Sequence, residues 1–114
     1  MSLIETILKQ GGITLTKDLQ EFVPNEGFFV ALDKEHEDFI GIKNTNKVEK
    51  KLKKYSKLAA QFNCYVGVWV SERDQRIYFD LSEHIESLSD ALYKGAQRKQ
   101  KAIYDCKNKE EVFV

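Results

Sequence analysis

The sequence lacks the residue biases that mark most special classes of protein. One proline and six glycines in 114 residues exclude a low-complexity linker. Because 18 basic residues balance 18 acidic ones, the chain is neither a uniformly basic nucleic-acid binder nor a strongly acidic mimic of DNA. No apolar run approaches the roughly 18–20 residues of a membrane span. The start, "MSLIETILKQGG", is too short and too polar for a signal peptide, so we expect a cytoplasmic protein without membrane contact.

The chain also has few residues suited to redox or metal chemistry. Its only cysteines, Cys64 and Cys106, form no C-x-x-C pair and lie next to strand-like sequence, so we expect reduced thiols that pack in the core. Its two histidines, His36 and His84, lack the second histidine or the cysteine pair of a strong metal motif. No glycine-rich phosphate loop or nucleophile elbow is present. These absences predict a protein without cofactor, bound metal or catalytic activity.

What is present is the composition of an ordinary globular domain. Hydrophobic residues make up 42% and charged residues 32% of the chain, which is wrong for a disordered segment. A length of 114 residues fits one hydrophobic core and leaves no room for a second domain. We therefore expect a single α+β domain that covers residues 1–114.

Two shorter helices are predicted near the ends of the chain. Ser2 and Glu5 form a capping-box pattern, and the glycine pair at 11–12 ends the N-terminal helix that follows. A second helix begins at Ser87 or Ser89. Its apolar side consists of small and aliphatic residues, namely Leu88, Ala91, Leu92, Gly95 and Ala96.

Runs rich in β-branched and aromatic residues predict the strands. "GFFVAL" (27–32) and "DFIGI" (38–42) are separated by polar residues and suggest an antiparallel hairpin, as do "CYVGVWV" (64–70) and "RIYFDL" (76–81). The other strand-like runs are 13–16, 102–105 and 111–114. Because helices fall between pairs of strands, we predict a mainly antiparallel sheet with two helices packed on one face, plus the short N-terminal helix.

Four short motifs follow one another in the second half of the chain: Gly67-x-Trp69, Tyr78-x-Asp80-x-Ser82, Ala91-x-x-x-Gly95 and Gln100-x-Ala102-Ile103-Tyr104-Asp105. In this order and spacing they resemble a family of small uncharacterised proteins carried by bacteriophages and related mobile elements. The similarity covers roughly the C-terminal half, with a weaker echo in "GFFVAL". The resemblance implies a shared fold and a phage or mobile-element context, and it brings no established activity.

The stretch "GAQRKQKAIYD" within these motifs is interpreted first as the junction of a helix and a strand. Gly95 lies on the apolar side of its helix, where the absence of a side chain lets the helix approach the sheet closely. The basic residues that follow suit the unsatisfied carbonyls of a helix C-terminus. Gln100 is expected to satisfy exposed backbone groups with its side-chain amide.

Aromatic residues give the first hypothesis about function. Alternation along 64–70 places Tyr65 and Trp69 on one strand face and three valines on the other, and Tyr78 can join the aromatic face from the next strand. If helices cover the valines, the three aromatic residues form an exposed patch of the kind found in protein interfaces and single-strand stacking platforms. The alternative is that the N-terminal segment covers this face.

The helix predicted at 46–62, with Asn46 or Thr45 as its cap, gives the second hypothesis. Its apolar stripe consists of Val48, Leu52, Tyr55, Leu58, Ala59 and Phe62. The sides away from this stripe carry Lys47, Lys50, Lys51, Lys53, Lys54 and Lys57. Such lysines can follow a phosphate backbone without reading sequence. The alternative is an ordinary helix face that contacts only solvent.

A third hypothesis is a metal-dependent hydrolase built on Asp80 with Glu83 and Glu86. Strand alternation argues against it, because it places Glu83 on the opposite face from the other two carboxylates. The sequence therefore favours a small non-enzymatic binding or accessory protein that contacts another protein, either itself or a host factor. Non-specific nucleic-acid binding through the lysine helix is the alternative.

Overall fold

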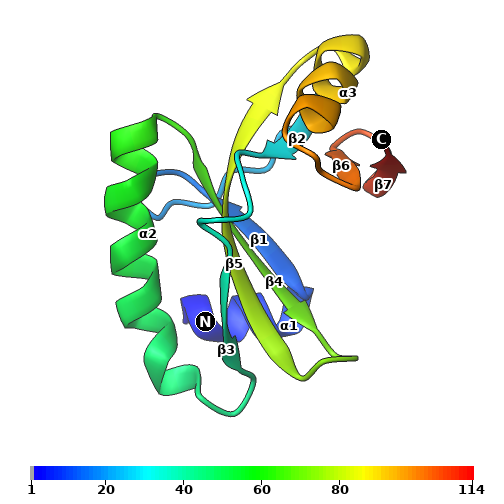
Figure 1. The fold of residues 1–114 in the computed structure, drawn as a ribbon. Coiled ribbons are helices and arrows are strands. Elements are labelled where there is room, and N and C mark those ends of the chain that lie inside the picture. Colours follow the sequence, from blue (N-terminus) through cyan, green and yellow to red (C-terminus); the bar gives the residue numbers. More distant parts are fainter. Residues whose placement is uncertain (1) are drawn as a thin grey trace.

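The structure is a computed structural model and describes residues 2–114. These residues form three α-helices and seven strands, and two or three strands follow each helix along the chain, as Figure 1 shows. In chain order they are α1 Leu3–Gln10, β1 Gly12–Leu15, β2 Phe28–Ala31, β3 Asp38–Gly41, α2 Val48–Phe62, β4 Tyr65–Ser71, β5 Arg76–Ile85, α3 Leu88–Gln97, β6 Ala102–Asp105 and β7 Glu110–Phe113. The predicted α+β class is confirmed. None of the helices within residues 2–114 is long and apolar enough to cross a membrane.

All seven strands belong to one antiparallel sheet in the order β1-β4-β5-β2-β6-β7, with β3 paired to β5. The hairpin predicted from 64–81 is confirmed as β4–β5, and the strand-like runs 102–105 and 111–114 form a second hairpin, β6–β7. The hairpin predicted from 27–42 is wrong, because β2 and β3 do not pair with each other. Both pair with β5, β3 along its first half and β2 along its second. β5 has ten residues, so it offers each short strand a separate stretch of backbone hydrogen-bonding groups.

The ends of two helices follow from local sequence. The Ser2 hydroxyl accepts a hydrogen bond from the Glu5 backbone N–H, and Gly11 ends α1 in the left-handed conformation with φ of 81°. Ser87 caps α3 through the backbone N–H of Asp90. The predicted cap at Asn46 is wrong, because a 3₁₀ turn, Thr45–Lys47, leads directly into α2 without a side-chain cap.

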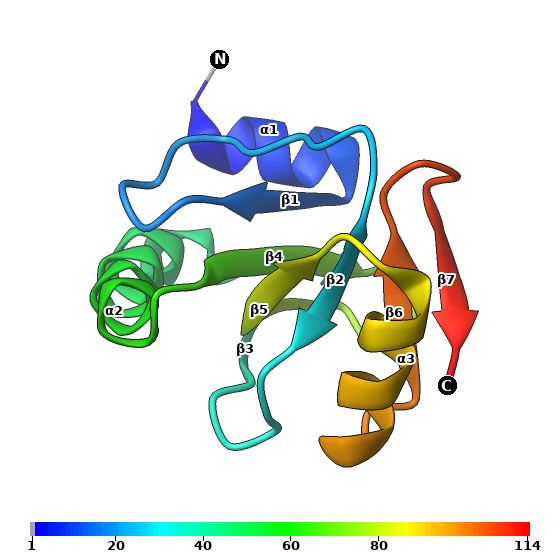
Figure 2. The same cartoon turned by 90° about the horizontal axis from the view of Figure 1, so that it is seen from above.

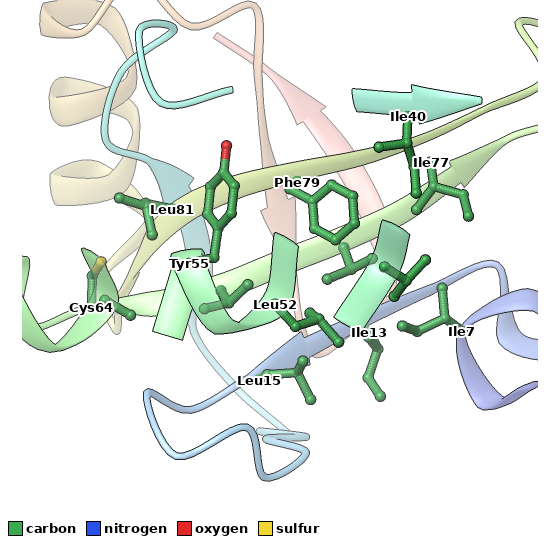
Figure 3. Close-up of a cluster of buried hydrophobic side chains, with 14 residues drawn as sticks. Ile7, Ile13, Leu15, Ile40, Leu52, Tyr55, Cys64, Ile77, Phe79 and Leu81 are labelled. Atoms are coloured by element: carbon green, nitrogen blue, oxygen red, sulfur yellow. The ribbon is translucent and has the colours of Figure 1, made fainter. Parts of the chain in front are cut away.

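The main core lies between α2 and one face of the sheet, as Figure 3 shows. Val66 and Val68 of β4 are 0% and 1% exposed, which confirms that the valines face the helix layer. α1 adds Ile7 to the same core. The other labelled members are Ile13, Leu15, Ile40, Leu52, Tyr55, Cys64, Ile77, Phe79 and Leu81. All three helices therefore lie on the valine side, and we call the opposite side of the sheet the open face.

A second, smaller core lies under α3, where Val30, Ala91 and Ile103 are buried together. A Cβ atom on Gly95 would lie 2.9 Å from a Val114 methyl and 3.1 Å from an Ile103 methyl. These short distances explain why position 95 is a glycine, as the sequence suggested. The close neighbours are side chains and not the backbone of the sheet. The two cysteines are free and buried, and burial raises the pKa of both Cys64 and Cys106 to about 11.

The sheet is strongly curved. Figure 2 shows β1 and β4 running across the view, while β6 and β7 run in a clearly different direction. The segment between β1 and β2, which we call the crossing segment, first turns back along β1, with a bridge between Leu15 and Glu21. Its Phe22 ring stacks on Tyr65 of β4 at 4.5 Å between centroids, so this segment lies against the open face.

Candidate functional site on the open face

The residues of the open face come from direct cross-strand neighbours. In the β4–β5 register Gly67 pairs with Asp80, and Trp69 pairs with Tyr78. Phe39 of β3 pairs with Tyr78 from the other side. Because side chains of directly paired residues point to the same face, these five residues form one surface.

Three aromatic rings, which we call the aromatic row, lie side by side on this surface. Trp69 stacks on Tyr78 with 4.2 Å between centroids and 9° between planes, and Phe39 lies 5.6 Å from Tyr78. Trp69 is 40% exposed and Phe39 44% exposed. The Arg76 guanidinium covers the Phe39 ring at 4.1 Å. The row is therefore ordered by its own stacking and still accessible to a partner.

Tyr65, which the sequence places with Trp69 and Tyr78, has a different environment. It lies between Phe22 and Phe29, whose rings are 4.5 and 6.1 Å from it. The sequence left open whether this face is exposed or covered by the N-terminal segment, and each alternative is right for part of it. The segment after β1 covers Tyr65, while Trp69 stays exposed and Tyr78 is half-buried.

Next to Trp69 the open face contains a pocket of about 730 Å³. Its lining comes from six strands, β1, β2, β4, β5, β6 and β7, and from the crossing segment near Phe22. The volume falls within the range of small-molecule and side-chain binding sites. The motif residues that line it are Gly67, Trp69, Asp80, Ser82, Gln100, Ala102, Ile103 and Tyr104. Motifs far apart in the sequence therefore meet at one pocket.

Asp80 is the chemically distinctive group of this open-face pocket. A Cβ atom on Gly67 would collide with the Asp80 carboxylate, so glycine at 67 makes the space in which that carboxylate lies. Burial raises the pKa of Asp80 to about 6, against a hydrogen bond from the Trp69 side chain that lowers it, and the charge of Glu37 raises it further. No basic side chain of residues 2–114 forms an ion pair with Asp80. The carboxylate is thus desolvated without a cation beside it.

Two further polar side chains line the pocket. Ser82 is only 6% exposed. The side-chain nitrogen of Gln100 is buried and has no hydrogen-bond partner among residues 2–114, so the expectation that this amide satisfies backbone groups is wrong. The backbone N–H of Gln100 instead closes the helix end by donating to the Gly95 carbonyl at 2.8 Å. A buried donor without a partner is uncommon in folded proteins.

The charge of the pocket is negative. Besides Asp80, the lining includes four carboxylates and a single lysine: Glu21, Glu37, Glu110, Glu111 and Lys109. Since closely spaced carboxylates attract cations and repel anions, the pocket favours a positively charged ligand.

The third hypothesis from the sequence receives no support from the geometry. Glu83 lies on the helix side of β5, where it binds Arg98 at 2.7 Å and Lys94 at 3.2 Å. Glu83 and Asp80 therefore lie on opposite faces, as strand alternation predicted, and Glu86 is exposed outside the pocket that Asp80 lines. Within residues 2–114 no group of three histidine, cysteine or acidic side chains is placed to hold a metal ion.

Only four of the six lysines predicted to form a basic surface line one groove. Lys47, Lys50, Lys51 and Lys54 line a groove of about 680 Å³ between the start of α2 and β3, which we call the lysine groove. One of them, Lys51, forms an ion pair with Asp38. The other two lysines of the predicted set, Lys53 and Lys57, are exposed outside this groove.

The fold and the pocket together define a small α+β protein with one helix-covered and one concave, accessible sheet face. Comparison of the chain with protein-family models, with curated proteins and with solved structures gave no match. Sequence reasoning missed Phe22 and Phe39 as site residues and considered Asp80 only as a metal ligand. The motif spacing did contain a signal, because Gly67 and Asp80 occur at positions that a tight β4–β5 hairpin brings opposite each other.

Proposed function

We propose that the protein acts by binding another protein through its open face, without catalysing a reaction. The observation that carries this proposal is the exposed Trp69 ring, stacked on the half-buried Tyr78 directly beside the polar pocket. Tryptophan, tyrosine and arginine dominate the binding energy of protein interfaces, and the aromatic row presents all three types with Arg76. Preordered rings also lose little conformational freedom when a partner arrives.

The charge of the pocket narrows the kind of partner. Two copies related by a two-fold axis through this face would bring two acidic pockets together, which costs free energy. A partner with basic groups at its surface fits better. The resemblance to phage and mobile-element proteins suggests that this partner belongs to the host cell.

The proposal can be tested by capture from a lysate of the cells in which the protein is made. We expect the wild-type protein to retain specific partners, and Trp69→Ala to lose them while remaining folded. Tyr93→Ala is the matched control, because Tyr93 is a 69% exposed aromatic residue on α3, away from the open face. Equal retention by wild type and Trp69→Ala would exclude the open face as the interface.

A second candidate function is non-specific nucleic-acid binding, which the lysine groove favours. Four lysines gather there next to the exposed Phe39 ring, and cationic grooves beside aromatic rings are typical of single-strand binding. We expect affinity that falls steeply with salt, and a strong loss in Lys50→Glu/Lys54→Glu. Lys53→Glu/Lys57→Glu changes the net charge equally outside the groove and should have less effect. No retention of DNA or RNA at about 50 mM salt would exclude this function.

A further inference from the structure

We propose that the open-face pocket binds an arginine side chain of the partner protein, with Asp80 as the group that receives the guanidinium. This inference rests on the proposed function and adds the chemistry by which the partner is recognised.

The first support is that Asp80 has space and no cation. Because Gly67 has no side chain, there is room for the Asp80 carboxylate beside it. No lysine, arginine or histidine of residues 2–114 forms an ion pair with this carboxylate. By contrast, the partly buried carboxylate of Glu83 has two cations beside it, Arg98 and Lys94. The missing positive charge at Asp80 is therefore expected from outside the chain.

The second support is the wall beside this carboxylate. The Trp69 side chain forms a hydrogen bond with Asp80 and lines the same pocket. A planar guanidinium can donate two hydrogen bonds to a carboxylate while it stacks on an aromatic ring, which a lysine ammonium cannot do. A site that combines the Asp80 carboxylate with the Trp69 indole therefore favours arginine over lysine.

The third support is the charge and polarity of the whole cavity. The other charged residues that line the pocket are Glu21, Glu37, Glu110 and Glu111, with Lys109 alone opposing them. An entering arginine neutralises part of this negative field, and the pocket volume of about 730 Å³ accommodates the side chain.

The test uses the full chain and a short peptide, acetyl-Gly-Arg-Gly-amide, with the citrulline peptide as its neutral, nearly isosteric control. Trp69 is the only tryptophan, so its fluorescence reports directly on the pocket. We expect the arginine peptide to change this fluorescence saturably with a Kd of about 1 mM, and the citrulline peptide to bind at least about tenfold more weakly. Asp80→Asn should lose the preference for arginine. Glu86→Gln, which removes an exposed carboxylate outside the pocket, should keep it.

Equal binding of the two peptides, or an unchanged arginine preference in Asp80→Asn, would overturn the proposal. If neither peptide binds while Trp69→Ala still loses the captured partners, the pocket chemistry is wrong and the open-face interface stands. If Trp69→Ala retains the partners as well, both are wrong. Sedimentation measures whether the protein associates with itself. Concentration-dependent assembly that Asp80→Asn abolishes would mean that the pocket takes a basic side chain of a second copy, which would overturn the assignment to a foreign protein.

Discussion

Replacing Asp80 by asparagine is expected to stabilise the protein at neutral pH and to have little effect in acid. In the folded protein, burial raises the pKa of Asp80 from 3.8 to about 6. Because 1.36 kcal/mol corresponds to one pKa unit, the ionised carboxylate costs about 3 kcal/mol of unfolding free energy above pH 6. Asparagine carries no charge and keeps an oxygen that accepts the Trp69 hydrogen bond.

The direction with pH follows from proton binding. Between about pH 4 and pH 6 the folded chain holds a proton on Asp80 that the unfolded chain has released, so wild-type stability falls as pH rises through this window. Asp80→Asn removes that fall. We expect the variant to exceed wild type by about 2–3 kcal/mol at pH 8 and by close to zero at pH 4.

Urea unfolding followed by far-ultraviolet circular dichroism at both pH values measures this difference without using the Trp69 signal. Asp38→Asn is the control of opposite sign. A hydrogen bond from Lys51 lowers the pKa of Asp38, so its ionised form stabilises the fold and the asparagine variant should lose stability at pH 8. If Asp80→Asn is no more stable than wild type at pH 8, the carboxylate is not desolvated and the reasoning about the pocket fails.

Three further substitutions test the packing and the site. Gly95→Leu should overpack against Ile103 and lower the unfolding free energy by roughly 1–3 kcal/mol, and a wild-type Tm would show that Gly95 has free space beside it. Gly67→Ala should displace the Asp80 carboxylate and abolish arginine-peptide binding in a protein that still folds, so unchanged affinity would contradict the proposed geometry. Ser87→Ala should cost about 1 kcal/mol in chemical unfolding through loss of the α3 cap, and no change would mean that the cap contributes nothing.

Much of the fold could be predicted because its signals are local. The alternation in 64–70 fixes which residues of β4 face the helices, and the burial of Val66 and Val68 agrees with it. Hairpins joined by short turns, β4–β5 and β6–β7, also follow from neighbouring sequence. In such cases the strand and its partner lie within a few residues of each other, so little other information is needed.

The pairing of β2 and β3 could not be predicted in the same way. Any antiparallel strand satisfies the backbone groups of such short runs, and nothing local shows that a ten-residue β5 has room for both. Phe22 was missed for a related reason. Its segment has no regular pattern, and it reaches Tyr65 because the chain turns back on β1, with a bridge between Leu15 and Glu21. The pocket combines this turn with strands from across the sheet, so sequence motifs indicated its residues without indicating that they meet.

Chemical-shift mapping with the arginine peptide tests most directly whether the open face is the binding surface. On ¹⁵N-labelled protein we predict saturable shifts of the backbone amides of Gly67, Asp80 and Ser82, with the amides of Lys50 and Lys54 unmoved. The amide signals sample both sides of the molecule, so the map separates the pocket from the lysine groove in one titration. Shifts confined to the α2 lysines, or no saturable shift at several times about 1 mM peptide, would contradict the assignment of the pocket as an arginine site.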